Sequence, residues 1–215
     1  MCGIFGFVAK DNGPLNLGVL ERVARVTQSR GPHSWGLAWV DLQDRMRMYK
    51  QTGKISDALG LLAMARDAKM LIGHCRYATH GAPENNLNNH PHPSDGGWIV
   101  HNGVIGHYRH LIDQHNLHPV TECDSEVVGL LIENLRGSRL ERCVQAVSLA
   151  RGRSPFAFMG LWADRLIVAR ANGQPLHCGE TKRGFYFASL AKGLPGEVAA
   201  FCDNEIYEYG EETHV

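Results

Sequence analysis

The sequence predicts an α+β fold made of layered, largely antiparallel sheets with helices packed outside them. Short strands come in pairs around tight turns, as SWGLAWV and RMRMYK do around DLQD, and blocks with helical spacing of apolar residues stand between such pairs. Hairpins mixed with helical blocks are typical of sheets covered by helices. No linker, repeat or low-complexity tract divides the 215 residues, so we expect a single domain over residues 1–215.

The elements of the first half follow from their apolar spacing. The opening MCGIFGFVA is a short apolar strand interrupted by glycines. Apolar residues recur with helical spacing from Val19 to Val26, and Gly31 with Pro32 ends this helix. After the SWGLAWV hairpin, ISDALGLLAMARDA keeps its apolar residues on one side of a second predicted helix. KMLIGHCRYA and GWIVHNG are predicted strands on either side of a loop rich in Asn, Pro and His.

The second half is predicted to hold three helices followed by strands. HYRHLIDQHN and DSEVVGLLIENLRG are two of these helices, and Leu140, Val144 and Val147 mark the third. PFAFMGLWADRLIVARA is predicted to form two strands around a turn at Ala163 and Asp164, and GFYFASL and EIYEYG are the last strands.

The charge balance argues against several kinds of partner. The chain has 22 basic and 22 acidic residues and no run of like charges, so we expect no nucleic-acid partner. No apolar stretch approaches the roughly 18–20 residues of a membrane span, and no charged-then-apolar leader precedes Cys2. We therefore expect a cytoplasmic enzyme or binding domain without a membrane partner.

Cysteines and histidines are the residues that would hold a metal. The six cysteines are scattered without a CxxC pair, so reduced thiols are expected. His90 and His92, in NNHPHPSDGG, are separated by a proline and have no cysteine or carboxylate cluster nearby in the sequence. We therefore expect no metal and no cofactor.

Cys2 directly follows the initiator methionine, which is removed when the next residue is as small as cysteine. The mature chain would then begin with a residue that carries both a thiol and an α-amine. An α-amine of pKa about 7.7–8.0 can accept the proton of a thiol of pKa about 8.5. Cys2 is thus a candidate nucleophile with its own base. The alternative is a small apolar residue that opens a buried strand.

Three further segments place polar residues beside glycines or at element ends. His101-Asn102-Gly103 is either a simple turn or an oxyanion hole, in which the Asn102 carboxamide and the Gly103 backbone N–H face a developing negative charge. Arg76 in GHCRYATHG is either a surface arginine or a two-bond grip on a carboxylate. Asp124 in TECDSEV is either a helix cap or the partner of a substrate ammonium. Together Arg76 and Asp124 would recognise an α-amino acid head group.

These segments resemble the motifs of the class II glutamine amidotransferases, whose glutaminase domain is an N-terminal nucleophile hydrolase. MCGIFG is similar to the nucleophile start, GHCRYATHG to the family's GHTRWATHG, HNGVIGHY to its HNGII loop and CDSEV to its TDTEV. NNLNNHPH resembles its NAHPH stretch, and the later strands match as well, so the resemblance covers nearly the whole chain. The most similar branch is the glutaminase half of glucosamine-6-phosphate synthase.

The resemblance implies a four-layer αββα sandwich and a role for each matching residue. Cys2 would be the nucleophile, its own α-amine the base, and Asn102 with Gly103 the oxyanion hole. Arg76 would hold the α-carboxylate of glutamine and Asp124 its α-amine. Further pocket-lining residues would be Tyr77, Thr79 and His80.

The chain departs from the family pattern at several positions. RGPHSWG stands where the branch has RGYDSAG, which leaves the role of Arg30 open. Cys75 replaces the usual threonine and Tyr77 the usual tryptophan, which we interpret as packing changes, with no catalytic role expected for Cys75. No synthase domain follows the glutaminase motifs within the 215 residues.

These features together predict a glutaminase that hydrolyses L-glutamine to glutamate and ammonia through a γ-glutamyl thioester on Cys2. We expect the ammonia to pass to a separate synthase, whose identity the sequence leaves open. One alternative is a hydrolase of another γ-glutamyl amide. A second alternative is a non-catalytic glutamine-binding module.

Overall fold

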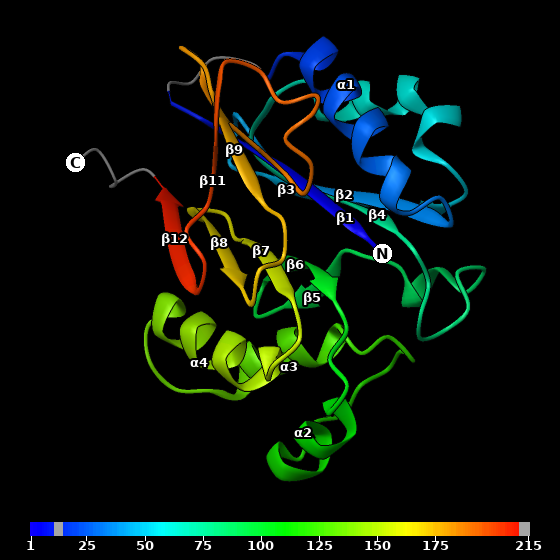
Figure 1. The fold of residues 1–215 in the computed structure, drawn as a ribbon, viewed down its shortest axis with the longest axis vertical. Helices are drawn as coiled ribbons and strands as arrows, with labels where there is room; N and C mark the ends of the chain where they lie inside the picture. Colours follow the sequence, from blue (N-terminus) through cyan, green and yellow to red (C-terminus); the bar gives the residue numbers. More distant parts are fainter. Residues whose placement is uncertain (11–14, 211–215) are drawn as a thin grey trace.

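The structure, a computed structural model, describes residues 1–10 and 15–210. Two antiparallel sheets stack face to face, and helices cover the outer face of each sheet (Figure 1). The order of layers is therefore helix, sheet, sheet, helix, which is the αββα sandwich that the resemblance implied.

The strand that directly follows Cys2 lies inside the first sheet. Strand β1 pairs antiparallel with β10 on one side and β4 on the other, and Gly3 stands opposite Cys75. This register brings Cys2 next to the end of β4, where Arg76 and Tyr77 follow. Within the described residues this sheet has seven strands, in the order β11 (Glu197–Ala200), β9 (His177–Glu180), β10 (Gly184–Ala188), β1 (Gly3–Ala9), β4 (Ala68–Arg76), β2 (Ser34–Asp41) and β3 (Met46–Thr52).

The second sheet carries Asn102 and Gly103 at the end of β6. Asn102 pairs with Ala157 and Gly103 with Phe156 of the neighbouring strand. In the described part of the chain this sheet has five strands, in the order β12 (Glu205–Gly210), β8 (Arg165–Ala171), β7 (Phe156–Leu161), β6 (Gly97–Gly103) and β5 (His92–Ser94).

Helices close the sandwich on both sides. On the first sheet lie α1 (Leu17–Thr27) and short 3-10 turns; on the second lie α2 (Tyr108–His115), α3 (Glu126–Asn134) and α4 (Arg139–Arg151). Helix α4 begins with a capping box, in which Ser138 and Glu141 satisfy each other's backbone N–H groups. None of the helices in residues 1–10 and 15–210 is long and apolar enough to cross a membrane.

Three apolar clusters fill the spaces between the four layers. Phe5 and Trp35 belong to the cluster between the first sheet and α1, and Ile4 and Met159 to the cluster between the two sheets. Phe158 and Val128 belong to the third, between the second sheet and its helices. Neighbours such as Ile4 and Phe5 alternate between clusters because successive side chains of a strand point to opposite faces.

Two predictions about elements are corrected. The predicted helix over ISDALGLLAMARDA is two 3-10 helices, Ile55–Asp57 and Leu59–Ala65, neither of which has a side-chain cap. Ala58, between them, has φ −134°, which breaks the helical path. Strands β5, β9 and β11 were also missed from the sequence, because strands of three or four residues are too short to show a period.

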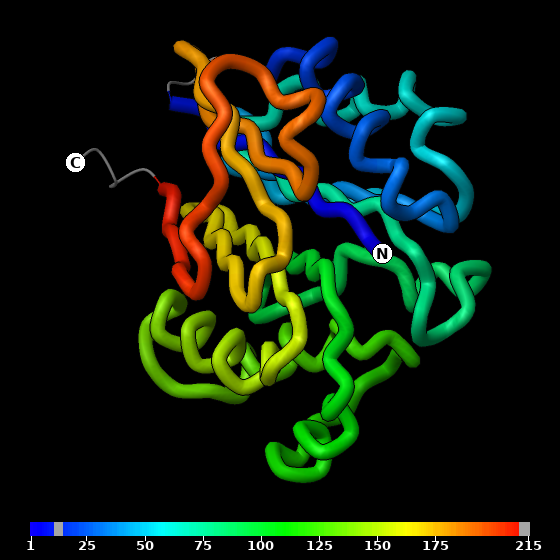
Figure 2. Tube along the Cα trace, viewed as in Figure 1, coloured from blue at the N-terminus to red at the C-terminus, as the bar shows by residue number. Residues whose placement is uncertain are grey.

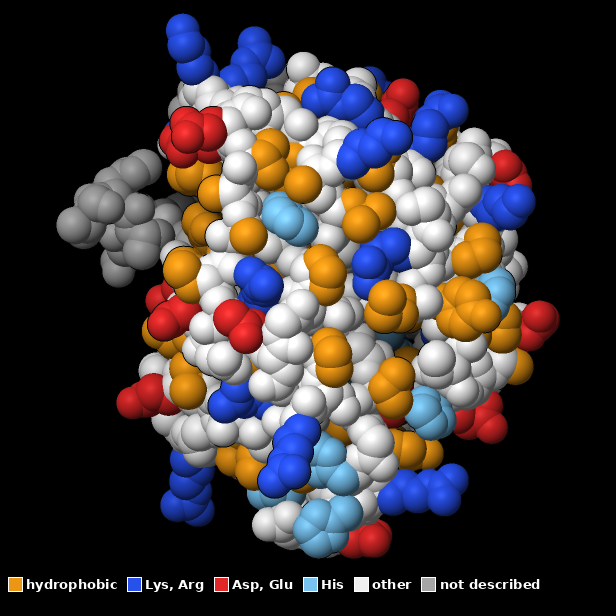
Figure 3. All heavy atoms as spheres, in the orientation of Figure 1, with side chains coloured by type: hydrophobic (Ala, Val, Ile, Leu, Met, Phe, Trp, Pro, Cys, Tyr) orange, Lys and Arg blue, Asp and Glu red, His pale blue; other side chains and the backbone are white. Residues whose placement is uncertain are grey.

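The surface does not gather charge of one sign on the face shown in Figure 3. Basic and acidic side chains are interspersed there, in keeping with the 22 basic and 22 acidic residues of the chain. The tube in Figure 2 shows the N-terminus near the middle of the molecule, directly before β1.

Candidate active site

Cys2 precedes β1 and contacts the backbone of the loop after β4. The Tyr77 N–H donates to the Cys2 Sγ at 3.2 Å, and the thiol donates to the Tyr77 carbonyl at 3.3 Å. On the other side, Arg30 Nε donates to the Cys2 carbonyl at 2.7 Å. The thiol is therefore positioned by backbone groups, while Arg30 orients the residue that carries it.

Competing effects act on the thiol of Cys2. Burial raises its pKa above the ordinary value, and the negative charge of Asp124 raises it further. The Tyr77 N–H, the N-terminal ammonium and the Arg76 guanidinium act in the opposite direction. Because burial is the largest cause, the thiol needs a nearby base to become a nucleophile.

The RGPHSWG loop, whose role the sequence left open, supports this arrangement. Besides the Arg30 contact, His33 Nδ1 accepts the Ala78 N–H at 3.1 Å, and the His33 ring packs against Tyr77 with centroids 4.8 Å apart. Gly31 has no room for a side chain, because a Cβ there would lie 2.4 Å from the Cys75 carbonyl oxygen. The loop therefore holds both Cys2 and the backbone that contacts its sulfur.

Asn102 is linked to β1 through Ser189. The Ser189 Oγ accepts from the Ile4 N–H at 3.0 Å and from Asn102 Nδ2 at 3.3 Å. Gln174 Nε2 donates to the Asn102 carbonyl at 3.1 Å, and Asn102 is 1% exposed. One serine hydroxyl thus ties the Asn102 carboxamide to the strand that starts at Cys2.

Gly103 follows Asn102 at a point of close packing. A Cβ at Gly103 would lie 2.5 Å from the Pro155 carbonyl oxygen and 2.7 Å from His101 Nε2. The position therefore requires glycine for packing.

Arg76 is buried, not a surface arginine. It is 2% exposed, and its Nη1 donates to Asn89 Oδ1 at 2.8 Å. Its Nη2 donates to the carbonyls of His80 and Gly81, the second at 2.9 Å. These bonds use three of the five guanidinium N–H donors. Arg76 thus holds the loop after β4 in shape.

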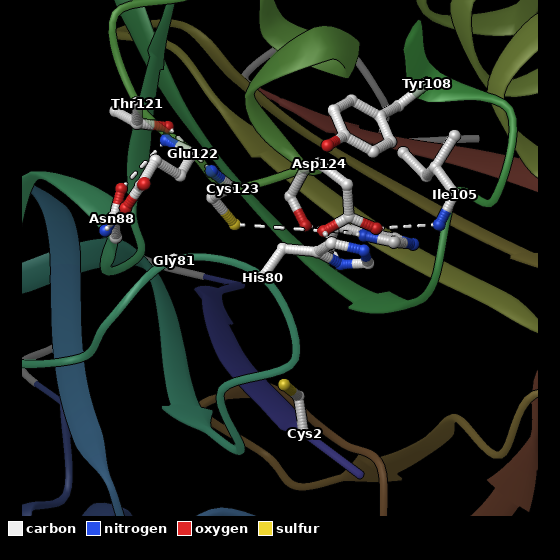
Figure 4. A network of polar contacts seen from close by, with 12 residues as sticks. Cys2, His80, Gly81, Asn88, Ile105, Tyr108, Thr121, Glu122, Cys123 and Asp124 are labelled. Carbon is white, nitrogen blue, oxygen red and sulfur yellow. Dashed lines mark hydrogen bonds and ion pairs between the residues drawn. The ribbon is translucent and has the colours of Figure 1, made fainter.

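Asp124 is also buried, and it does not cap α3, whose N-cap is Ser125. The Asp124 Oδ2 accepts the Ile105 N–H at 2.7 Å, and its Oδ1 lies 3.8 Å from His80 Nδ1 (Figure 4). The His80 ring meets Tyr108 edge-on, with centroids 5.5 Å apart. One carboxylate oxygen is thus fixed by the backbone, and the other faces His80 and accepts the Cys123 thiol at 3.9 Å.

The remaining predicted pocket residues are more open. Tyr77 is 46% exposed and contacts Cys2 through its backbone, while Thr79 is exposed in the same loop. His80 is half-buried beside Asp124. The structure therefore brings Cys2, Arg76 and Tyr77 together at one strand end, with His80 bridging toward Asp124.

Sequence reasoning missed the asparagines that brace this region. Asn88 accepts the Glu122 N–H at 2.9 Å and donates to the Glu122 carboxylate at 3.1 Å, which ties the loop before β5 to the loop before α3. Asn89 accepts from both Arg76 and Ser34. The asparagine-rich run NNLNN was the available signal, because buried asparagines need several hydrogen-bond partners.

Comparison with known proteins places this site in a family. No family model matches the chain. The chain is 35% identical to the glutamine–fructose-6-phosphate aminotransferase of Aquifex aeolicus over 99% of its own length and 37% of that protein. It is 32% identical to the Listeria innocua enzyme of the same name over 94% of its length and 34% of that protein. The chain belongs to the class II glutamine amidotransferases.

Solved structures show the same fold. The glutamine phosphoribosylpyrophosphate amidotransferase of B. subtilis superposes with a TM-score of 0.74 at 21% identity, over all of this chain and 50% of that one. A class II glutamine aminotransferase domain protein from Silicibacter pomeroyi superposes with a TM-score of 0.65 at 16% identity, over 98% and 96% of the two chains. The chain described by this structure spans about a third of the length of the two curated relatives it matches.

A group of buried histidines, with one cysteine, lies near these residues. His74 Nε2 lies 3.1 Å from the His101 carbonyl, and its ring stacks on His90 with centroids 3.9 Å apart. His90 meets His92 edge-on at 4.4 Å. Cys123 joins His90 and His92, and the ligand atoms of these three residues all lie within 4.8 Å of one another. Cys123 is distant from the HPH histidines in the sequence, and the fold brings it to them, which the sequence argument about metal ligands did not foresee.

Proposed function

We propose that the chain hydrolyses the side-chain amide of L-glutamine to glutamate and ammonia, with Cys2 as the nucleophile. The observation that carries this proposal is the position of Cys2 at the start of β1, with its sulfur on the Tyr77 backbone and Asn102 joined to the same strand through Ser189. Its relatives are named as enzymes that use glutamine.

The proposed chemistry uses the chain's own groups. The α-amine of a mature Cys2 takes the thiol proton, directly or through water, and the sulfur attacks the glutamine amide carbon. The Asn102 carboxamide and the Gly103 N–H stabilise the negative oxygen of the tetrahedral intermediate. The amine returns the proton to the leaving ammonia, which leaves a γ-glutamyl thioester on Cys2. Water, deprotonated by the same amine, then releases glutamate and restores the thiol.

This mechanism requires that Met1 be removed, because the amine must belong to Cys2. Met1 is 73% exposed, so a peptidase can reach it. We expect the active protein to lack Met1, as intact-mass measurement would show. Full activity from a chain that retains Met1 would rule out the N-terminal base.

We infer that Arg76 and Asp124 recognise the α-carboxylate and α-ammonium of glutamine. Two N–H donors of Arg76 remain beyond its three internal bonds, and the Asp124 Oδ1 faces the half-buried His80 rather than a backbone donor. Tyr77, Thr79 and His80 would line the pocket between them. Binding of the ammonium would then replace the His80 contact of Asp124.

The remaining parts of the proposal concern the setting of the enzyme. We propose that residues 1–215 act as one glutaminase domain, that the ammonia goes to a separate synthase, and that the site of action is the cytoplasm. The acceptor of the ammonia stays open, because the curated relatives extend well beyond the part that this chain matches.

The test is glutamate release from L-glutamine by the purified mature chain. We expect Cys2→Ser to lower turnover by several orders of magnitude with an unchanged circular dichroism spectrum, because a hydroxyl is much harder to deprotonate. Cys143→Ser, on the buried face of α4, is the matched control. Equal turnover by Cys2→Ser and the control would contradict the proposal. A panel of other γ-glutamyl amides tests the alternative substrate class.

A further inference from the structure

His90, His92 and Cys123 form a compact group that the proposed reaction does not use. His90 lies in the loop before β5, His92 opens β5, and Cys123 precedes α3. All three are buried, with 2%, 0% and 5% of their surface exposed. Their ligand atoms lie within 4.8 Å of one another, so three donors from two separate segments converge on one point.

The histidine nitrogens in this group lack partners. Neither ring nitrogen of His90 and neither of His92 has a hydrogen-bond partner among the residues that the structure describes. Buried polar groups are normally satisfied, so four such atoms on two adjacent rings require an explanation. A bound ion that accepts lone pairs from both rings would supply one.

We propose that His90, His92 and Cys123 bind one zinc-class transition-metal ion. Two imidazoles and a thiolate are donors that suit zinc, whereas magnesium and calcium prefer oxygen ligands. Bond lengths of about 2.0–2.1 Å to nitrogen and about 2.3 Å to sulfur place tetrahedral ligands about 3.3–3.6 Å apart. The ligand atoms, now up to 4.8 Å apart, therefore need to approach one another by up to about 1.2–1.5 Å, and the fourth position takes water.

The state of the ligands agrees with this proposal. Burial keeps the pKa of both His90 and His92 well below the ordinary value, so the rings are neutral and have lone pairs to donate. The thiol of Cys123 exchanges its proton for the ion: the S–H bond breaks, the metal–sulfur bond forms, and one proton leaves for solvent. Burial and the negative charge of Asp124 raise the pKa of the Cys123 thiol to about 11, while Arg76 acts in the opposite direction, so the ion itself must displace this proton.

The third ligand departs from the family motif. The HPH histidines match the family's NAHPH stretch, but Cys123 stands where the family's TDTEV has threonine. A threonine hydroxyl does not belong to the usual zinc ligands. The replacement of threonine by cysteine therefore completes a donor set that the family motif lacks.

Metal binding is best measured on the full chain without a histidine tag and with Cys2→Ala. This change removes the N-terminal thiol, which together with an α-amine would bind zinc by itself, and it makes the result independent of glutaminase activity. The chain is stripped with a chelator, reloaded with Zn²⁺ or Co²⁺ and dialysed. Metal per chain is measured by mass spectrometry, and thiolate-to-cobalt charge transfer by near-ultraviolet absorption.

We expect one zinc ion per chain and a charge-transfer band with cobalt. Adding Cys123→Thr should remove the band and weaken zinc binding at least tenfold, since even an outer partner of a ligand is worth about 10–100-fold. His92→Asn, a second variant from the other segment, should weaken zinc binding likewise. Adding Cys143→Ala, another buried thiol, should change neither.

Three results would overturn the proposal. The first is a reloaded chain with much less than one ion after dialysis. The second is zinc binding that Cys123→Thr leaves unchanged although the variant keeps its circular dichroism spectrum. The third is an equal loss of binding in Cys143→Ala, which would mean that any core change causes it.

Discussion

Cys2, the proposed nucleophile, and Arg76 and Asp124, the proposed recognition residues, differ in the contacts that hold them. The Cys2 sulfur contacts one backbone unit, that of Tyr77, and Cys2 is half-buried at the start of a strand. Arg76 and Asp124 are 2% and 3% exposed, and each is fixed by bonds to the loops around it. The Cys2 sulfur thus contacts the backbone of a single residue, whereas the Arg76 and Asp124 side chains are packed and hydrogen-bonded within the structure.

This difference separates two kinds of residue in the same site. A nucleophile that forms and loses a covalent bond needs room to move, so changes at Cys2 should affect turnover and leave stability alone. Recognition groups that also brace loops should affect both glutamine binding and stability when they are replaced.

Asn102→Ala should lower kcat by about 10²–10³, the usual loss for one oxyanion donor. Ser189→Ala is the companion change, because it keeps Asn102 but removes the hydroxyl that orients its carboxamide. We expect a smaller loss of kcat from Ser189→Ala. Steady-state glutamate release measures both. An unchanged kcat in Asn102→Ala would remove Asn102 from the oxyanion hole.

Arg76→Lys should raise KM for glutamine and also lower the free energy of unfolding by about 1–3 kcal/mol. A lysine cannot reach the three acceptors that the guanidinium satisfies, and buried acceptors without a donor are costly. Arg66→Lys, at an exposed arginine whose Nε donates to the Ala63 carbonyl, is the control. Urea denaturation gives the stability. A raised KM with wild-type stability would show that Arg76 does not brace the loop.

Asp124→Asn should raise KM for glutamine, because a neutral amide replaces the anion expected opposite the ammonium. The same substitution should matter little for a glutamine analogue without the α-amine. Inhibition constants of that analogue against both proteins provide the comparison. If wild type binds the analogue as tightly as glutamine, Asp124 does not recognise the ammonium.

The buried histidines predict a loss of stability in acid. Burial lowers the pKa of His74 to about 3 and of His101 to about 4. An unfolded histidine has a pKa of about 6.5, so the unfolded chain binds more protons below that pH and the folded state loses stability as the pH falls from about 6.5 toward 4. Each histidine should contribute about 1 kcal/mol per pH unit.

Urea denaturation at pH 7.0 and pH 5.5 measures this dependence. His101→Gln should reduce the slope with pH, and His110→Gln, an exposed histidine on α2, should leave it unchanged. A free energy of unfolding that stays the same between the two pH values would contradict the assignment of neutral buried histidines.

Much of the fold was predictable because its central strands have strong local signals. The apolar runs of β1, β4 and β7 lie in the middle of the sheets and match the predicted strands. Edge strands such as β11, whose four residues are all exposed, are too short to show a period that could be detected. The 3-10 helices were predicted as one helix because spacing alone does not distinguish the two geometries.

In the site, too, residues within local motifs could be predicted, whereas contacts between distant segments could not. Short motifs of consecutive residues indicated Cys2, Asn102 and Asp124 as candidate site residues. The brace from Arg30 to the Cys2 carbonyl, the Ser189 link and the meeting of Cys123 with His90 depend on segments that are far apart in the chain. No local pattern contains those contacts, so they required the three-dimensional structure.

The most direct test of Cys2 as the nucleophile is labelling by a diazoketone analogue of glutamine, followed by peptide mapping. Of the six cysteines, Cys2 alone should be alkylated, with loss of activity in proportion to the label and protection by glutamine. Burial holds the pKa of the Cys75 thiol well above its ordinary value, so this neighbour on β4 should stay unmodified. Label on Cys75 or Cys123 with Cys2 untouched would contradict the assignment of the nucleophile.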